Sequence, residues 1–302
     1  MALKDIKNKI KSTERTHKVT RAMEAVSAVK MRKTQQAALA DRSYAEAALS
    51  ILTRLSGTED VKQHPLAAKR GSNKLALLVI TSDKGLAGAL NSGVIKRALE
   101  AVEGRSPAEV TVFAYGRKGE EYFARRGYRM VGAFGNKQDD VPLGEMEELM
   151  QIITAGFLAG EFDKVVTVYS KFKSTFEQVP TMRRLLPLSL PALTEIVEGI
   201  IPNKGRFSDA RHLTPPAAYT VEPQSAEVLG GIIPRLITVA LYHMLLESKA
   251  SEHSARMVAM KSASDKSEEV AFDLTRLYNK IRQAAITREV SEIVGGREAL
   301  AK

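Results

Sequence analysis

Apolar residues recur at alternating spacings of three and four in the C-terminal part of the chain. The positions are Met260, Ala263, Ser267, Val270, Leu274, Leu277, Ile281 and Ala284. A repeat that averages about 3.5 residues is typical of a helix that packs along one narrow seam in a left-handed coiled coil. Upstream, residues 232–246 are apolar on most faces, so we expect this part of the helix to lie against a globular core. Gly295-Gly296 is an ordinary stop signal, and the helix is predicted to end there.

The N-terminal segment has a weaker pattern, formed by Leu3, Ile6, Ile10, Val19, Met23 and Val26 and followed by many alanines. Small residues allow a partner helix to approach closely. We therefore predict that this segment pairs with the C-terminal one in an antiparallel coiled coil. Serine and alanine at seam positions predict a coil of less than maximal stability.

Neither terminal segment contains a helix breaker. Residues 1–56 and residues 235–294 lack both glycine and proline. At a rise of ~1.5 Å per residue, continuous helices over these segments would be about 84 and 90 Å long. The residues between them would form a globule only about 40 Å across. We therefore expect the helices to project beyond it.

The middle of the chain alternates short apolar runs with helical stretches. We expect strands over residues 75–81, 109–114, 128–133, 164–170 and 178–188, and helices over 87–101, 117–126 and 144–158. Residues 75–81 are apolar almost throughout, as in parallel strands that are buried on both faces. Such an alternation predicts an α/β sheet with right-handed crossovers. The proline-rich residues 188–223 are expected to form a long loop.

These patterns predict an α/β fold class, with a long antiparallel helical coiled coil built from the two termini and a central Rossmann-like α/β domain. The expected boundaries are 1–56 for the N-terminal helix, 57–225 for the globular domain and 226–302 for the C-terminal helix. No window of about 18 residues approaches an uncharged apolar span, so we do not expect a transmembrane helix.

The net charge of +10 is concentrated at one end of the chain. Residues 1–56 carry 12 Lys and Arg against 5 Asp and Glu. Such an excess on a projecting helix implies an acidic partner, which could be nucleic acid, anionic lipid or a protein with acidic loops. Nucleic acid is the less favoured alternative, because residues 1–43 hold no aromatic side chain on which a base could stack.

Candidate chemistry is sparse. The loop Ser82–Gly88 follows a strand and precedes a helix, where phosphate loops occur, but it matches neither common phosphate-loop pattern. We interpret it as a structural turn, with small-ligand binding as the alternative. The absence of cysteine excludes disulfides and thiolate metal sites. The histidines have no metal-ligand spacing, and no catalytic constellation or cofactor site is expected; they are His17, His64, His212, His243 and His253.

Three stretches resemble the γ subunit of F-type ATP synthases, the central stalk of that complex. They are Leu3–Lys7 with Thr20–Met23 and Lys30–Lys33, then Ser82–Asn91, and finally Ala250–Met260 with Tyr278–Thr287 and Glu292–Gly296. His64–Leu66 and Gly116–Gly119 also fit the family. The resemblance covers essentially the whole chain, and its third stretch is the most specific.

The resemblance implies that the coiled coil is a rotating stalk inside a ring of α and β subunits, while the α/β domain contacts the ε subunit and the membrane c-ring. Met23 would face an acidic loop of β, and Arg282, Gln283 and Thr287 would lie near its catch loops. Arg256 would help to couple the two helices. The tip with Ile293, Val294, Ala299 and Leu300 would turn in an apolar collar.

The family further implies a subunit without catalytic residues or cofactors of its own, in a proton-driven complex. That complex would lie on the cytoplasmic face of the bacterial cell membrane, with this subunit as a peripheral component. The alternative that the residues leave open is a basic coiled-coil protein that binds nucleic acid or serves as a scaffold.

Overall fold

The computed structural model describes residues 3–40, 64–71, 73–136, 141, 143–188 and 225–300. The chain forms two compact units. The helix-pair unit contains Met1–Ser27 and Arg256–Lys302, and the globular unit contains Ala28–Ala255. The two long helices contribute to both: α1 spans Leu3–Ala40 and α8 spans Ser225–Leu300. The predicted helix over residues 41–56 and the loop over 189–223 lie outside the described residues.

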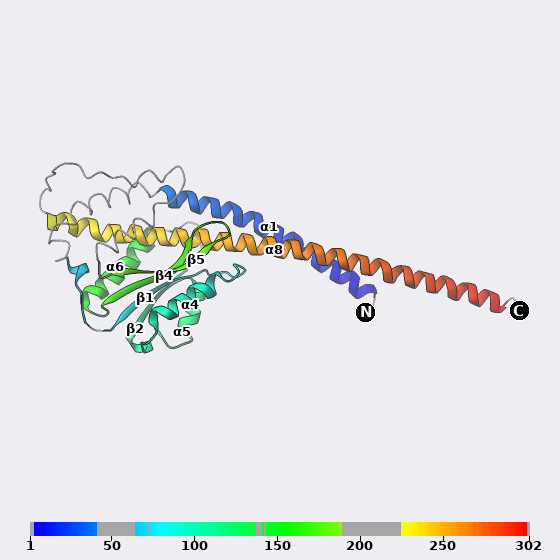
Figure 1. Ribbon diagram of the computed structural model, residues 1–302, viewed down its shortest axis with the longest axis horizontal. Helices are drawn as coiled ribbons and strands as arrows, with labels where there is room; N and C mark the ends of the chain where they lie inside the picture. Colours follow the sequence, from blue (N-terminus) through cyan, green and yellow to red (C-terminus); the bar gives the residue numbers. More distant parts are fainter. Residues whose placement is uncertain are drawn as a thin grey trace. The chain divides into compact units, whose positions relative to one another are not determined.

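A five-stranded sheet in the order β3-β2-β1-β4-β5 forms the centre of the globular unit (Figure 1). Its strands are β1 (Leu75–Ile80), β2 (Val110–Tyr115), β3 (Arg129–Phe134), β4 (Lys164–Phe172) and β5 (Gln178–Leu186). The first four are parallel to one another, as expected for strands joined through helices. β5 is antiparallel to β4, because only the short turn 173–177 connects them.

Three helices connect the parallel strands, close to where the sequence predicts them. They are α4 (Leu90–Val102), α5 (Arg117–Ala124) and α6 (Leu143–Ala159). Two short 3₁₀ turns, η1 (Pro65–Ala67) and η2 (Pro107–Glu109), complete the described elements. Helices α4 and α5 cover one face of the sheet, and α6 with the first part of α8 covers the other (Figure 1).

The inner strands β1 and β2 are buried on both faces, which explains why β1 is apolar throughout and β2 largely so. Val79, Val94 and Phe123 belong to the core on the side of α4 and α5. Leu78 and Ile153 belong to the opposite core, together with the apolar side of α8. The central strand β1 therefore needs an apolar residue at every position.

The first part of α8 is apolar enough to pass a compositional test for a membrane-spanning helix, so the expectation that no window comes close was wrong. Its side chains are nevertheless core residues. Leu229, Ile233, Leu236 and Leu241 are fully buried in the cluster that covers the sheet. Burial against β-strands accounts for this hydropathy, as the apolar pattern of residues 232–246 predicted.

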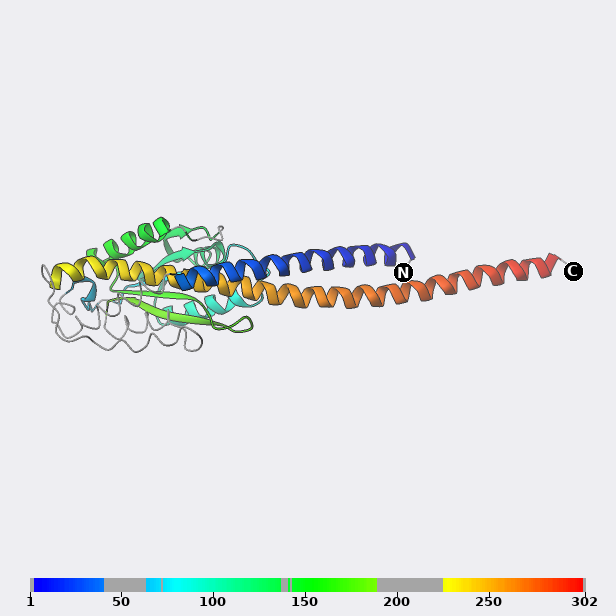
Figure 2. The same cartoon turned by 90° about the horizontal axis from the view of Figure 1, so that it is seen from above.

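In the helix-pair unit, the two helices run side by side in opposite directions (Figure 2). Nδ1 of His17 in α1 lies 3.0 Å from the carbonyl oxygen of Ser264 in α8, which fixes the level at which they pair. The predicted antiparallel pair is confirmed. The predicted stop at Gly295-Gly296 is wrong, because α8 continues to Leu300. Glycine only raises the cost of a helical residue by about 1 kcal/mol, so the two glycines do not force an end.

Candidate functional site

The seam of the helix pair is unexpectedly polar on the α1 side. Ile6 is fully buried and Ile10 and Met23 are half-buried, as predicted, but Thr20 and Ser27 are buried and Thr13, His17 and Glu24 half-buried. Val19 and Val26, which the apolar pattern assigned to the seam, are more than half exposed. The seam therefore holds hydroxyl groups and an imidazole where a stable coiled coil would hold leucine.

These hydroxyl groups are satisfied within their own helices. Thr20 donates to the carbonyl oxygen of Thr16 at 3.0 Å, and Ser27 donates to that of Met23 at 2.7 Å. On α8, Ser267 donates to the carbonyl oxygen of Ala263 at 2.7 Å. Such bonds to the preceding turn satisfy a buried hydroxyl without linking the helices. The seam is thus polar, yet these groups add no directional bond between α1 and α8.

The seam of α8 is shifted from its predicted register. Its least exposed positions are Met260, Ala263, Ser264, Ser267, Ala271, Leu274, Tyr278, Ile281 and Ala285. Ser264 is more deeply buried than Ala263, which is half-buried, and Tyr278 occupies the seam in place of Leu277, which is 42% exposed. The period of 3.5 was predicted correctly, but alternate positions are displaced by one residue.

α8 extends beyond the first residue of α1. Because His17 pairs with Ser264 in an antiparallel arrangement, Leu3 lies at about the level of Tyr278. The remaining stretch to Leu300 corresponds to about 33 Å of helix at 1.5 Å per residue. Figure 2 shows this extension in red. Its side chains meet no second helix among the described residues.

Three of the predicted site residues lie together on this extension. Arg282, Gln283 and Thr287 are all exposed, and the Thr287 hydroxyl donates to the carbonyl oxygen of Gln283 at 3.0 Å. Gln283 and Thr287 therefore lie one turn apart on one side of α8. These three residues, here called the exposed patch, lie within two turns of the extension, although Arg282 points about 100° away from Gln283 around the helix.

Apolar side chains form a second feature of the extension. Ile286, Val290, Ile293 and Val294 follow helical spacing, and each is at least half exposed. Ile293 is the most exposed, at 72%. The resemblance had pointed to Ile293 and Val294, whereas Ile286 and Val290 were missed because they fall outside the heptad pattern. An exposed apolar stripe of this kind marks an interaction surface.

The other two predicted site residues lie elsewhere. Met23 is half-buried and Arg256 is buried, so neither belongs to the exposed patch. By the pairing of His17 with Ser264, Met23 and Arg256 lie near one level of the helix pair. Arg282 is 26 residues further along α8, which is about 39 Å. The five residues thus form two separate groups.

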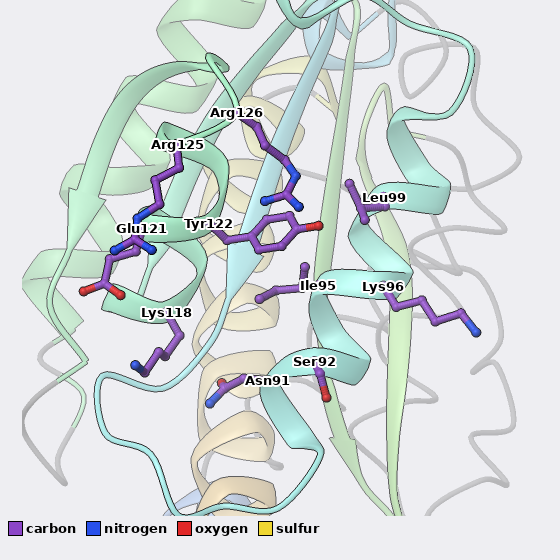
Figure 3. Close-up of a pocket in the computed structure, with 10 residues that line it drawn as sticks. All are labelled: Asn91, Ser92, Ile95, Lys96, Leu99, Lys118, Glu121, Tyr122, Arg125 and Arg126. Atoms are coloured by element: carbon purple, nitrogen blue, oxygen red, sulfur yellow. The ribbon is translucent and has the colours of Figure 1, made fainter.

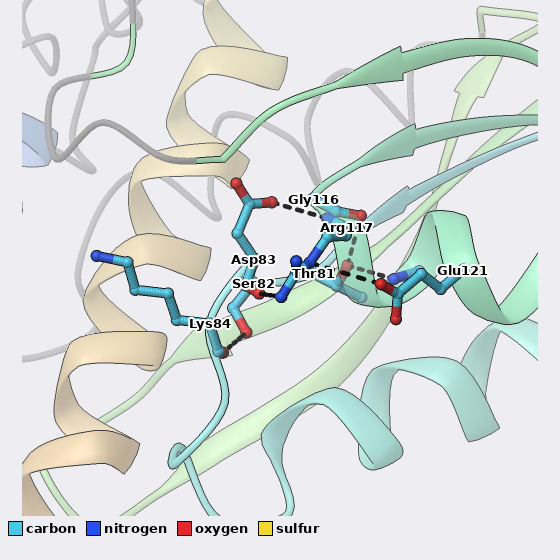
Figure 4. Close-up of polar contacts among 8 residues, drawn as sticks. Thr81, Ser82, Asp83, Lys84, Gly116, Arg117 and Glu121 are labelled. Carbon is cyan, nitrogen blue, oxygen red and sulfur yellow. Dashed lines mark hydrogen bonds and ion pairs between the residues drawn. The ribbon is translucent and has the colours of Figure 1, made fainter.

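The loop Ser82–Gly88 is built into the globular unit by hydrogen bonds (Figure 4). Oδ1 of Asp83 accepts from the backbone N–H of Arg117 at 2.7 Å, at the N-terminus of α5. Asn91 accepts from the backbone N–H of Ser82 at 3.0 Å and donates to its hydroxyl at 2.7 Å. Because these polar groups bind one another, the geometry favours the structural turn over a phosphate loop.

Gly116 is required by this arrangement. Its φ of +106° lies in a region that other residues rarely adopt. A Cβ atom at this position would lie 2.0 Å from the carbonyl oxygen of Thr81. The glycine therefore lets β2 enter α5 directly beside the end of β1.

A cluster of titratable groups is buried between α8 and the sheet. Nε2 of His243 lies 3.9 Å from Glu247, and Tyr169 hydrogen-bonds to Glu247. Burial lowers the pKa of His243 to about 4 and raises the pKa of Glu247 to about 7. His243 is therefore neutral at pH 7, and the contact is not a full ion pair. No group of His, Asp and Glu suited to a metal occurs among the described residues.

Comparisons with known proteins agree across the whole chain. A family model described as ATP synthase matches residues 2–300. The ATP synthase gamma chain of Pelotomaculum thermopropionicum is 40% identical over 99% of both chains. That of Opitutus terrae is 39% identical over 99% of this chain and 98% of its own.

Solved structures give the same result. The central stalk and c-ring structure of the Tetrahymena thermophila mitochondrial ATP synthase contains a chain with 25% identity and a TM-score of 0.59, covering 82% of this chain and 99% of that one. A chain in the Euglena gracilis mitochondrial ATP synthase has a TM-score of 0.64 at 19% identity, over 99% and 94%, which shows the shared fold. The sequence matches favour the stalk interpretation over a nucleic-acid-binding or scaffold protein, and the chain belongs to the ATP synthase gamma chain family.

Proposed function

We propose that this chain is the rotary central-stalk subunit of a proton-translocating F-type ATP synthase. In this role it transmits rotation of a membrane ring to the nucleotide-binding subunits that make ATP. The observation that carries the proposal is the α8 extension, which presents Arg282, Gln283 and Thr287 beside an apolar stripe and has no second helix along it among the described residues. An enclosing ring of partner subunits would cover such a surface.

The basic exposed face of α1 supports a role in rotation. A shaft that passes equivalent stations should avoid strong bonds at any one angle. On α1, the exposed face carries Lys4, Lys7, Lys11, Arg15, Lys18 and Arg21. Exposed ion pairs of such side chains with acidic loops contribute only about 0–1 kcal/mol each, so they form and break readily. The positive charge of α1 thus attracts acidic partners, but each ion pair is too weak to stop the rotation.

The predicted contacts divide into two groups along the helix pair. Arg282, Gln283 and Thr287 would contact the catch loops of β, since all three are exposed on the extension. Met23 would face the acidic loop of β through the part of its side chain that is exposed. Arg256 is buried, which supports a role in coupling the two helices and argues against direct contact with β.

The partners would be the α and β subunits around the helix pair, and the ε subunit and c-ring at the globular unit. The chain would act within a membrane-associated complex, at the cytoplasmic face of the bacterial cell membrane. We assign it no cofactor and no catalytic residue of its own, because ATP chemistry would take place on its partners.

Single-molecule rotation tests this proposal. A bead attached to this chain in the assembled complex should turn when ATP is supplied and the ring is fixed, with one copy of the chain per ring. Isolated chain should not hydrolyse ATP. A complex that hydrolyses ATP while the bead stays still, or a chain that purifies as a homodimer without ring subunits, would exclude the stalk role.

A matched pair of variants tests the contact group on the extension. Arg282→Glu should slow rotation and coupled ATP synthesis, because it reverses a charge at the proposed contact with the catch loops of β. Arg276→Glu makes the same change within the paired stretch of α8, at an exposed position, and should have a smaller effect. Equal effects of both variants would remove the specific role of Arg282.

A further inference from the structure

We propose that the cleft between α4 and α5 is a docking site for an acidic amphipathic helix of a partner protein. The cleft has a volume of about 500 Å³ and lies on the outer side of the two helices that cover one face of the sheet (Figure 3). Four of its lining residues are basic and one is acidic. This inference goes beyond the stalk role and does not depend on it.

The wall formed by α5 has positive charges on both sides of an aromatic ring. Lys118, Tyr122 and Arg125 follow one another at positions i, i+4 and i+7, so they share one side of α5. The Cα atoms of Lys118 in α5 and Arg125, its C-cap, thus lie about 10 Å apart along the helix axis. The guanidinium of Arg126 lies over the Tyr122 ring, 3.7 Å from its centroid. This wall is therefore cationic at each end and aromatic in the middle.

The opposite wall, from α4, contributes two apolar side chains, Ile95 and Leu99, together with polar residues. Asn91, Ile95 and Leu99 are spaced by four residues, so they form one stripe that faces α5. In Figure 3 the Ile95 side chain points toward the Tyr122 ring, whereas Lys96 points away from the cleft. Ile95, Leu99 and Tyr122 form an apolar floor between the charged ends.

The basic charge of the cleft is not neutralised within the described part of the chain. Glu121 is the one acidic lining residue, and it already lies 3.6 Å from Arg117 outside the cleft lining. Neither Lys118 nor Arg125 makes an ion pair with any described residue. The cleft is therefore complementary to negative charge, and an anionic partner would be attracted to it.

The combination of basic residues with an apolar floor favours one kind of anion. A single phosphate group would leave the apolar floor of Ile95, Leu99 and Tyr122 uncovered, whereas an amphipathic helix can contact both the cations and this floor. A helix with carboxylates at i and i+7 has the same spacing, and an apolar residue at i+4 would reach the floor of the cleft. Binding of an amphipathic helix in an apolar groove is a recurrent mode of recognition.

A binding titration with designed peptides tests the proposal on the full chain. The probe is a fluorescein-labelled, alanine-rich helical peptide with glutamates at i and i+7 and a leucine at i+4. One control peptide has glutamines in place of the glutamates, and the other has glutamates at i and i+5, on different sides of the helix. We expect only the probe to bind, with an affinity that falls as salt is added.

Variants of the chain assign binding to the cleft. Lys118→Glu and Arg125→Glu should each weaken binding of the probe about tenfold or more. Lys164→Glu, an equal charge change at the exposed start of β4, should leave it unchanged. Circular dichroism checks that all variants are folded. The proposal is overturned if the probe does not bind, if all peptides bind alike, if inorganic phosphate at the peptide's concentration displaces the probe, or if Lys118→Glu and Arg125→Glu bind normally.

Discussion

His17 and Ser264 form a polar contact between the two helices of the pair: the imidazole Nδ1 of His17 lies 3.0 Å from the carbonyl oxygen of Ser264 and 3.2 Å from its hydroxyl. The two residues are 247 positions apart in the chain, so this contact fixes the register of α1 against α8. The other seam hydroxyls described above bond within their own helices and leave the register to packing.

This register is open to a direct test, because the natural chain has no cysteine. The double variant His17→Cys with Ser264→Cys should form a disulfide in high yield under mild oxidation, since the two side chains touch. The pair His17→Cys with Leu277→Cys should remain reduced, because Leu277 is 13 residues further along α8, or about 20 Å. Mass spectrometry after digestion measures both yields. Efficient crosslinking of the second pair would contradict the observed register.

The elements of the globular unit were predictable because their patterns are local. An apolar run such as Leu75–Ile80 fits a strand covered on both faces, and no other part of the chain changes that interpretation. The antiparallel direction of β5 follows from its short connection to β4, which the pattern of strands did not include.

The seam residues were harder to predict, because the side of α1 that contacts α8 at one end fixes the contact side along the rest of the helix. Ile6 and Ile10 set the contact side of α1, and steps of three and four from Ile10 then place His17 and Thr20 in the seam. Val19 is more hydrophobic than either of these two, but it lies one residue, about 100°, out of phase. The hydrophobicity of single residues therefore predicted the wrong seam positions, because the helical phase set by Ile6 and Ile10 fixes which later residues face α8.

The candidate site was only partly accessible from the sequence for a different reason. Exposure of Arg282, Gln283 and Thr287 depends on where α1 begins relative to α8, which follows from the pairing of His17 with Ser264. The buried Glu247 cluster combines residues of α8, β4 and β5 that are far apart in the chain. No spacing rule could have brought them together.

The buried pair of His243 and Glu247 predicts an unusual dependence of stability on pH. For Glu247, the folded-state pKa of about 7 exceeds the ordinary 4.5, so its contribution is fully present below pH 4.5 and is lost as the pH rises to about 7. For His243, the folded-state pKa of about 4 is below the ordinary 6.5, so its contribution is present above pH 6.5 and is lost as the pH falls to about 4. The two slopes oppose each other between about pH 4.5 and 6.5.

Single variants should reveal each slope, because burial, Lys171 and Arg183 shift these pKa values, and neither residue is a cause of the other's shift. In His243→Gln, the free energy of unfolding should fall from pH 4.5 to 7 by on the order of 3 kcal/mol. In Glu247→Gln, it should instead rise by a similar amount from pH 4 to 6.5. Denaturant titrations across this range measure both changes. Glu161→Gln, at an exposed position, is the control and should follow the natural chain; parallel curves for all variants would refute the assignment.

Gly116 should tolerate no side chain. Gly116→Ala combines a φ of +106° with a Cβ atom 2.0 Å from the carbonyl oxygen of Thr81, so the free energy of unfolding should fall by at least about 2 kcal/mol. Gly71→Ala is a matched control, because no atom lies within 4 Å of its added Cβ and its φ is not positive. Thermal or denaturant unfolding distinguishes the two. Equal stability of both variants would show that the end of β1 can move to make room.

Two substitutions of Leu277 test separately whether α8 must be continuous and whether the Leu277 side chain must pack. Leu277→Pro removes a backbone hydrogen bond and introduces a clash with the preceding turn, which costs about 3 kcal/mol or more in a helix interior. If α8 transmits torque as proposed, this variant should reduce coupled ATP synthesis by the assembled complex at least tenfold, while nucleotide binding by the ring is kept. Leu277→Ala should keep normal coupling, because the leucine is 42% exposed and lies outside the observed seam. Normal coupling in Leu277→Pro would mean that an unbroken α8 is not needed for torque. Loss of coupling in both variants would instead mean that the Leu277 side chain itself contacts a partner.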